Sequence, residues 1–429
     1  MNTTPSPVLF ATALLVSAFV LPTTACAFAE IERGSLTLST TGRVAYDSNV
    51  AGHDSAQGDT VYTLAPTLNY SRAAGLGTIA ASLGVAINRY ADLSTQDSED
   101  ISSSLHISLP TPEGAREQGS FSAGYTDASD IDDSVGQRIR SKTWKASFVG
   151  TYRVGTRVNL NGSLSYSDTT RAVFTDRTQF GAGLGFDYSD FLGGFGLNGD
   201  YRYADTQSSS FTSGRDTSID QTSHSVSSGL FYRFVSGLRA SANVGYRWLD
   251  RGASETLSGQ TGNNGMTIGI KLDGPFLPPS RFPKLKSSFA IGLQKGEALG
   301  LNDSGSTTLV GNLSLGWQAR ERTALTFSAS RTQGLSTANE SSVDNVVQLG
   351  ATQRIGERTS LSAQLGQEWS TYPTTGRSDR RTRGSVSLGY SLNRYWRTGA
   401  DYSVTLTHSS NSLLTYDRHV VSAYVNYTF

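Results

Sequence analysis

The sequence predicts an all-β protein, a single transmembrane antiparallel β-barrel of about twenty strands with short periplasmic turns and longer extracellular loops. Three observations predict it. Segments of about ten to thirteen residues alternate apolar with polar side chains along the chain, charged residues within them keep to the polar face, and short connections alternate with long polar ones. Eighteen strands is the alternative count, because strand boundaries read from patterns shift by a few residues.

The composition narrows the class of protein. A chain of 429 residues is long enough for two or three ordinary domains or for one large barrel. Its 36 basic and 36 acidic residues give a formal net charge of zero, without the basic excess that a nucleic-acid partner requires. The one cysteine, Cys26, lies in a segment that we expect to be removed, so we expect no disulfide, no thiolate metal site and no cofactor.

The N-terminus reads as an export signal. Residues 8–20 are apolar or small, and the stretch TTACAFA that follows offers cleavage after Ala27 or Ala29. The apolar run is too short to span a bilayer comfortably, and the first seven residues lack the usual Lys or Arg. We expect a cleaved signal peptide over residues 1–29 and an outer-membrane barrel over residues 30–429. A lipoprotein acylated on Cys26 is the alternative.

The alternation is clear in TWKASFVGTYRV, where Trp144 and Phe148 share one face of a strand and Lys145 and Arg153 the other. The segments RVNLNGSLSYSD, LRASANVGYRW and GADYSVTLTH repeat the pattern. A soluble sandwich also alternates. Lipid, however, enforces the segregation of charge, because a midplane Arg or Lys facing it costs roughly 2–4 kcal/mol.

Aromatic residues gather near strand ends on the apolar face, as in the interfacial girdle of a membrane barrel. They are Tyr166, Trp248, Trp317, Trp369 and Phe429. No segment of the mature chain is apolar for eighteen residues, so the sequence offers no transmembrane helix.

The connections fall into two kinds in strict alternation. The short kind includes residues 154–156, 235–237, 355–357 and 393–396. The long kind includes DSNVAGHDSAQGD, DASDIDDSVGQR, QSSSFTSGRDTSIDQ, RGASETLSGQTGNN and TYPTTGRSD. This asymmetry is typical of transmembrane barrels and predicts the cell outer membrane as the location.

The C-terminal segment VVSAYVNYTF alternates to its last residue. An open sheet edge is not tolerated in hydrocarbon, so this strand is predicted to close against the first one, around residues 36–46. Val425, Tyr427 and Phe429 resemble the signal by which outer-membrane barrels are recognised for assembly. They predict the barrel assembly machinery and outer-membrane lipid as partners.

Few residues suggest catalysis. Of the histidines His53, His106, His224, His408 and His419, we place only His106 in a strand interior, on the lumen face with Ser104 and Ser108. A Ser–His site also needs an orienting group, so we interpret His106 as one polar residue of the lumen and predict no enzyme.

The acidic segment DASDIDDSVGQR is interpreted as a loop. Its carboxylates Asp127, Asp130, Asp132 and Asp133 suit Ca²⁺ but lack the EF-hand spacing. We therefore favour a solvated loop over an ion site and predict no metal site.

Four arginines are candidates for the lumen wall, together with Lys145 and His106. Arg153, Arg233, Arg239 and Arg247 lie on polar faces near two short turns. They would form a positive rim that favours anionic solutes, or pair with Asp and Glu of neighbouring strands, which is the interpretation we favour.

The connection LDGPFLPPSRFPKLK, residues 272–286, is longer than the other short turns and holds four prolines, which cannot donate to a strand ladder. It is interpreted either as a rigid loop for a partner, such as polysaccharide-export components, or as a segment packed at the barrel mouth.

Residues 42–100 carry a family resemblance, in GRVAYDSNV, VYTLAPTLNYSR and INRYADLSTQDSED. The residues that carry it are Tyr46, Asp47, Ser48 and Asn49, then Pro66, Tyr70 and Arg72, and the segment 90–100. This part resembles the N-terminal region of the putative β-barrel porin family often found with exopolysaccharide biosynthesis and secretion genes. The resemblance implies an outer-membrane barrel, in some members one that passes polysaccharide, and it transfers no catalytic residue.

The expected function is a passive outer-membrane channel for exopolysaccharide export or for diffusion of related solutes through a polar lumen. Two alternatives stay open. One is an outer-membrane barrel enzyme acting on lipid or polysaccharide, and the other is a non-conducting structural or adhesion barrel.

Overall fold

The structure is a computed structural model. It describes residues 29–31, 34–74, 77–109, 115–132, 134–172, 174, 176–209, 219–251, 264–277, 282, 284–295, 307–336, 341–373 and 375–429. The predicted signal peptide, residues 1–29, lies almost wholly outside the described residues.

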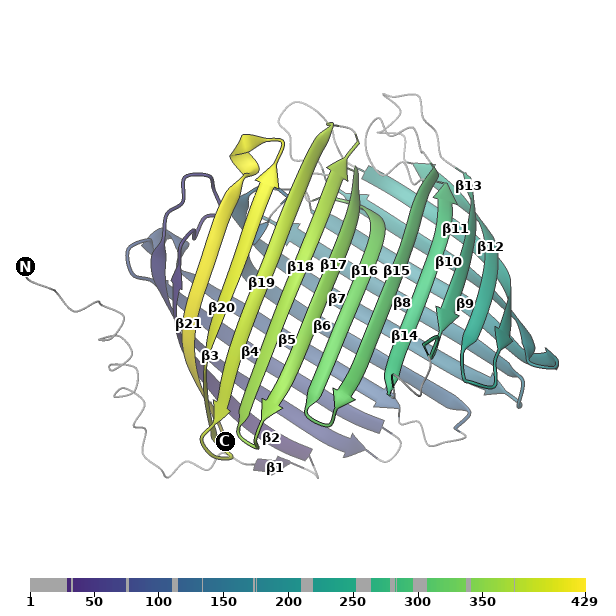
Figure 1. Cartoon of the computed structure of the whole chain (residues 1–429), viewed down its shortest axis with the longest axis horizontal. Helices are drawn as coiled ribbons and strands as arrows, with labels where there is room; N and C mark the ends of the chain where they lie inside the picture. Colours follow the sequence, from purple (N-terminus) through teal and green to yellow (C-terminus); the bar gives the residue numbers. More distant parts are fainter. Residues whose placement is uncertain are drawn as a thin grey trace, which may run out of the picture.

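The described residues form one antiparallel sheet in which twenty strands, β2 to β21, close into a barrel (Figure 1). Both the all-β class and the count of twenty strands are confirmed. A short additional strand, β1 (Ala29–Ile31), pairs with the start of β2. The barrel strands are β2 (Gly34–Asp47), β3 (Asp59–Ala74), β4 (Gly77–Tyr90), β5 (Ser98–Leu109), β6 (Glu117–Asp132), β7 (Gln137–Val154), β8 (Val158–Arg171), β9 (Arg177–Leu192), β10 (Phe195–Ser208), β11 (Ile219–Arg233), β12 (Arg239–Arg251), β13 (Gly265–Asp273), β14 (Leu285–Lys295), β15 (Thr307–Arg320), β16 (Thr323–Leu335), β17 (Ser341–Ile355), β18 (Thr359–Tyr372), β19 (Arg377–Ser391), β20 (Trp396–Ser409) and β21 (Tyr416–Thr428).

The last strand closes the sheet against the first, as the alternating C-terminal segment predicts. The register runs from Ser39 opposite Thr428 to Asp47 opposite Val420. Beyond the ladder, the Phe429 amide donates to the Leu38 carbonyl at 2.8 Å. Because each of the twenty strands from β2 to β21 then has two neighbours, the described part of the barrel has no open edge.

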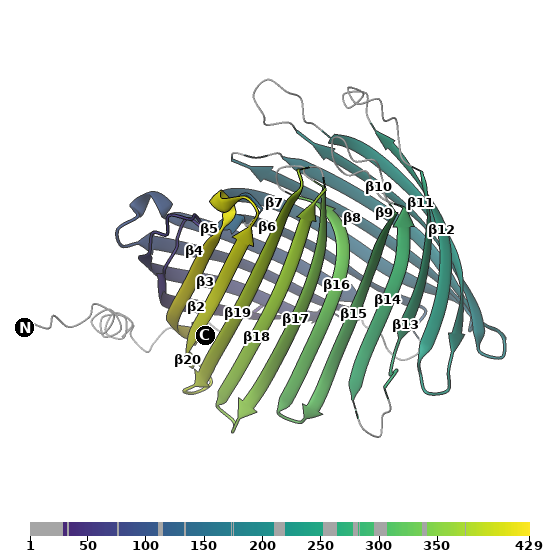
Figure 2. The same cartoon turned by 45° about the horizontal axis from the view of Figure 1, so that its top comes forward.

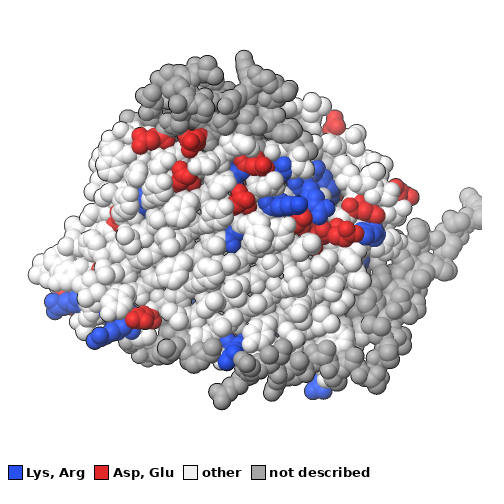
Figure 3. Space-filling view, turned by 180° about the vertical axis from the view of Figure 1, so that it is seen from behind, with Lys and Arg blue, Asp and Glu red and all other residues white. Residues whose placement is uncertain are grey.

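The two faces of the sheet differ as the alternation predicts. Large apolar side chains such as Trp144, Leu164 and Leu184 point outward and are half-exposed or more. Seen from behind, the outer surface shows a broad band without charged groups, while Lys, Arg, Asp and Glu gather mainly above this band and near the lower edge (Figure 3). Outward charged residues such as Arg89, Glu99 and Arg140 lie near the upper strand ends. This distribution suits an apolar membrane interior.

The barrel is flattened rather than round. Strands β14 to β21 form the wall in front in Figure 1, the early strands form the wall behind, and β10 to β13 lie at the right-hand end in both Figures 1 and 2. The sheet must bend sharply at this end, which places inner-face residues of nearby strands close together.

The connections lie at two rims. We call the end that carries connections such as 48–58, 209–218 and 252–264 the long-loop rim, and the end that carries 155–157, 193–194 and 321–322 the short-turn rim. The alternation of short and long connections holds in general but not strictly. The segment DASDIDDSVGQR was predicted as a loop, yet strands β6 and β7 take up most of it and leave only residues 133–136 between them. TYPTTGRSD likewise leaves only 373–376.

Within the described residues, the helices are two 3₁₀ turns, Ser94–Gln96 and Ser412–Leu414. None of the helices there has the length and apolar character needed to cross a membrane.

Candidate functional site in the polar inner wall

A large polar cavity lies on the inner face of β9 to β14, at the sharply bent end of the barrel. It is a groove of about 660 Å³. Strand alternation brings hydroxyl, amide and charged side chains to this face, while the neighbouring residues on each strand point outward. The volume is within the range of small-ligand sites, about 300–1,000 Å³.

Three ion pairs line the groove. The Arg239 guanidinium lies 2.7 Å from the Asp187 carboxylate, and the Lys271 ammonium lies 2.7 Å from that of Asp273. Within β10, the Arg202 guanidinium is 3.3 Å from the carboxylate of Asp200. Basic and acidic groups therefore alternate along the wall, and the groove offers donors and acceptors with little net charge.

Glycines let inner-face side chains meet across an intervening strand. The Asn198 side chain on β10 donates to the Asn243 side chain on β12 at 3.0 Å, passing over Gly229 of β11. A Cβ at Gly229 would lie 1.9 Å from the Asn243 oxygen and 2.5 Å from the Ala242 carbonyl oxygen, so any side chain there would displace this bridge.

Phe231 lies two residues after Gly229, on the same face of β11, and supports the same bend. Its ring is 2 % exposed and lies where a Cβ at Gly196 would be, only 2.1 Å from the nearest ring atom. The Arg239 guanidinium lies 3.8 Å from the centre of this ring. Stacking on Phe231 directs Arg239 along the wall to Asp187, two strands beyond β11.

The predicted lumen arginines are not all in one place. Arg239 and Arg247 line the groove, and Arg247 donates to the Ser223 hydroxyl at 3.1 Å. Arg153 and Arg233 alternate onto the inner face at the short-turn ends of β7 and β11, outside the groove lining. The pairing of Arg239 with a carboxylate agrees with the interpretation favoured from sequence, although the two strands are not neighbours.

Lys145 and His106 lie on other parts of the inner wall. Lys145 lines two cavities, of about 400 Å³ and 600 Å³, between β6 and β9. The His106 ring nitrogen Nδ1 lies 2.9 Å from the hydroxyl of Ser122 rather than from Ser104 or Ser108.

The prediction that only His106 lies within a strand is wrong. His224, His408 and His419 also lie in strands, in β11, β20 and β21. His224 and His419 share hydrogen bonds with the hydroxyls of Tyr201 and Tyr402, at 2.8 and 2.9 Å.

The acidic segment is part of two strands and is already paired. Asp127 on β6 accepts a hydrogen bond of 2.7 Å from Arg140 on β7, and Asp132 caps the turn by accepting from the Ser134 amide at 2.9 Å. Asp133 lies outside the described residues. Across the part of the chain that the structure describes, no group of three or more His, Cys, Asp or Glu side chains could hold a metal ion.

A second polar network at the long-loop rim was missed from sequence. Glu368 on β18 accepts hydrogen bonds of 2.7 Å from both Arg381 and Arg383 on β19. Opposite walls also meet there, because Arg177 on β9 donates to the Ser336 carbonyl after β16 at 3.0 Å. This contact crosses the barrel and narrows the mouth at the long-loop rim.

The acidic partners in the groove, Asp187, Asp200 and Asp273, were also missed from sequence. Each lies on the polar face of its strand, so the alternation could have placed them on the inner wall. The alternation does not encode the bend of the sheet, which brings Asp187 on β9 close to Arg239 on β12.

The comparisons with known proteins agree with this architecture. Residues 304–429 match the model of a family described as "Putative beta-barrel porin 2". The match supports a β-barrel porin family for this chain. The match covers β15 to β21 and not residues 42–100. It therefore does not test the N-terminal motif on which the family resemblance was based. No curated protein matches the chain in sequence.

Solved structures with a similar fold include transporters and import receptors. The FrpB iron transporter from Neisseria meningitidis superposes with a TM-score of 0.53 at 9% identity, over 92% of this chain and 82% of that one. The siderophore receptor PiuA from Acinetobacter baumannii gives 0.51 at 10% identity, over 94% and 82%. The ferric-catecholate import receptor Fiu from E. coli K12 gives 0.51 at 8% identity, also over 94% and 82%. At these identities the likeness shows the fold alone.

Proposed function

We propose that the protein is an outer-membrane channel through which hydroxyl-rich solutes diffuse, and that exopolysaccharide, or its fragments, is the cargo. The observation that carries this proposal is the groove of about 660 Å³ in the inner wall, where hydroxyl and amide groups alternate with three ion pairs. Such a wall offers a sugar many weak hydrogen bonds without a single tight site, which is what conduction requires.

The charges of the groove favour neutral or weakly charged solutes over strongly anionic ones. Arg239 and Lys271 are each within 2.7 Å of a carboxylate. A paired arginine has less attraction left for a solute than the open positive rim that was the other interpretation of the sequence.

A liposome swelling assay tests the proposal. Vesicles that contain the folded protein should swell in neutral mono- and oligosaccharides at rates that fall with solute size, because the solutes share one polar passage. Swelling no faster than in protein-free vesicles, for every sugar, would contradict it. For the cargo, cells that lack the protein should retain exopolysaccharide in the periplasm, and normal export from such cells would contradict that part.

The barrel-enzyme alternative gains little from the site. Among the described residues, the hydrogen-bond partner of His106 is a serine, with no carboxylate placed to orient the ring. The family match and the fold neighbours are a porin family and transport proteins, which is consistent with a protein that is not an enzyme.

A further inference from the structure

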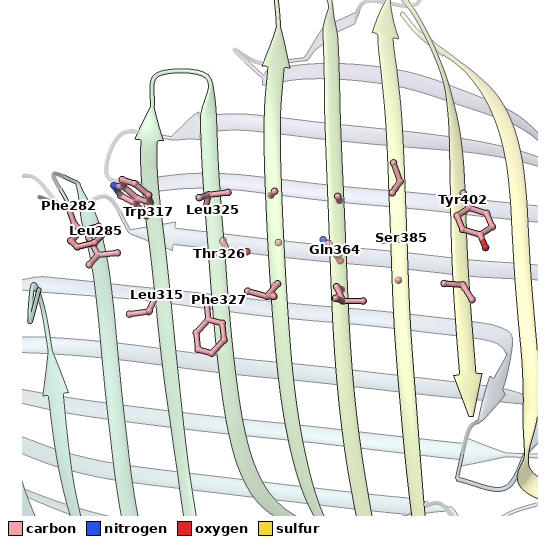
Figure 4. A pocket seen from close by; sticks show the side chains of 18 of the residues that line it. Phe282, Leu285, Leu315, Trp317, Leu325, Thr326, Phe327, Gln364, Ser385 and Tyr402 are labelled. Atoms are coloured by element: carbon pink, nitrogen blue, oxygen red, sulfur yellow. The ribbon is translucent and has the colours of Figure 1, made fainter. Parts of the chain in front are cut away.

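The outer wall carries an apolar groove that the proposed channel does not use. It crosses β14 to β20 and has a volume of about 670 Å³. Figure 4 shows its side chains projecting from these strands, with Phe282 and Trp317 at one end and Tyr402 at the other. None of the described residues that line it is charged.

Small residues make the floor of this groove. Ala351 on β17 lies directly opposite Ala363 on β18, and Gly384 on β19 lies opposite Leu365. Their neighbours on the same face are large, so the wall is indented at this point and raised around it. Leu349 and Leu365 flank the floor and are 50 % and 54 % exposed. When no molecule fills an indentation of this kind, the atoms of its floor lack van der Waals partners on the outer side.

The long connection at the short-turn rim closes one end of the groove. Strand β13 ends at Asp273 and β14 begins at Leu285, which leaves residues 274–284 as the connection between them. Leu277 and Phe282 of this connection line the groove, and the Phe282 ring meets the Trp317 ring edge-on at 5.4 Å between centroids. These contacts lie on the outer wall and not over the opening of the barrel, so they do not decide between the two interpretations of the sequence, and docking of export components stays a prediction.

The rim beside this end is basic. Four exposed arginines lie at the three connections that join β15 to β16, β17 to β18 and β19 to β20: Arg320 ends β15, and Arg322, Arg358 and Arg394 lie in the turns. No described residue forms an ion pair with any of these four. Arg320 lies three residues beyond Trp317, roughly 10 Å along a strand. The same turns carry two exposed acidic residues, Glu321 and Glu357, so the apolar groove ends at a rim where four arginines outnumber two carboxylates.

We propose that the groove binds one phospholipid, with an acyl chain along the floor and the phosphate at Arg320 and Arg322. The lengths agree. Ala351 lies four residues before the end of β17, roughly 13 Å along the strand, and half of a hydrocarbon core about 30 Å thick is similar. Arginine binds phosphate oxygens with paired, charge-assisted hydrogen bonds. The site rests on the membrane location of the barrel but not on conduction.

Native mass spectrometry of the detergent-solubilised full chain, titrated with dioleoylphosphatidylglycerol, tests the site. Ala363→Phe fills the floor, and the matched control is Ala242→Phe, which adds the same ring at an outward alanine of β12. Arg320→Gln with Arg322→Gln removes the charges, and Arg157→Gln in the β7–β8 turn is its control. Each groove variant should weaken binding of the first lipid about tenfold, a change of one decade in the dissociation constant, and the controls should leave it unchanged.

Three results would overturn the proposal: equal affinity in Ala363→Phe and Ala242→Phe, no effect of the arginine pair, or a second copy of the chain bound in place of lipid. If Ala363→Phe disturbs the barrel, the arginine variants provide an independent readout, because these two residues lie at the exposed end of β15 and in the turn after it. Failure of this test leaves the swelling assay unaffected, since that assay reports only on the lumen.

Discussion

Arg418 forms a bidentate ion pair with Asp47 across the closure of the barrel. Asp47 ends the first barrel strand, β2, and Arg418 lies near the start of the last, β21. Arg418 donates from Nη2 to the Asp47 carboxylate at 2.7 Å and from Nε at 3.0 Å, although the two residues are 371 positions apart in the chain. Asp47 also accepts a hydrogen bond from the Asn49 amide at 3.0 Å. Asn49 is fully buried and receives the amides of Gly52 and His53 on its side-chain oxygen. The Asp-Ser-Asn sequence of the N-terminal motif therefore ties the closure to the loop above it.

Breaking this pair should weaken the closure. In Arg418→Met the Asp47 carboxylate, 2 % exposed, loses its charged partner, and loss of one member of a buried pair costs about 3 kcal/mol. Urea unfolding in lipid vesicles should show a free energy lower by about that amount, and Arg157→Met, in an exposed turn, should change it little. Equal unfolding of the two variants would show that Arg418 does not hold the seam.

Gly229→Ala should disturb the groove in the lumen. The added Cβ would meet both the Asn243 side chain and the Ala242 backbone, so β11 and β12 would have to separate. Gly316→Ala is the matched control, since a Cβ there meets nothing within 4 Å. We expect a loss of about 1–3 kcal/mol in unfolding free energy for Gly229→Ala alone, as for other overpacked positions. Wild-type stability of Gly229→Ala would refute the crossing of side chains over β11.

Arg239→Gln should make the channel more selective for cations. It leaves the Asp187 carboxylate facing the lumen without its partner at 2.7 Å, and an unpaired acidic group favours cations. The reversal potential across a KCl gradient should shift toward that of K⁺, and adding Asp187→Asn should restore the wild-type value. A reversal potential that is the same in all three proteins would place this pair outside the ion path.

The predicted assembly signal is tested by changing Tyr427 and Phe429 to Ala. Their rings meet edge-on at 4.3 Å, and the Tyr427 ring also packs on Trp396 at 4.4 Å. We expect less heat-modifiable barrel in cells but normal refolding of the purified variant into detergent, because recognition rather than packing is lost. Thr428→Ala is the control on the inner face. Refolding that fails as completely as assembly would assign the two rings a purely structural role.

The sequence patterns predicted the face of each side chain better than the ends of the strands. Alternation encodes which face a side chain takes, so it placed Trp144 outward and correctly paired residues 420–428 with the first strand. It does not encode where a strand ends, and polar strand ends such as Asp127 to Asp132 resemble a loop in composition. Strands that extend past the membrane carry polar residues on both faces, which removes the signal that separates strand from loop.

The candidate site was predictable only in part for a related reason. Arg239 and Arg247 could be assigned to the polar face from their own strand. Their partners could not, because Asp187 reaches Arg239 only through the bend at β10 to β12, and this bend depends on Gly196, Gly229 and Phe231 together. Pairings between strands that are not neighbours depend on curvature, which a two-residue period does not carry.

Single-channel recording in planar lipid bilayers shows directly whether the folded barrel conducts ions. We expect the refolded protein to insert and to open an ion-conducting path, and we expect Arg239→Gln to change the ion selectivity of this path without abolishing conduction. A fully folded, heat-modifiable barrel that inserts into the bilayer yet passes no measurable current would contradict this expectation.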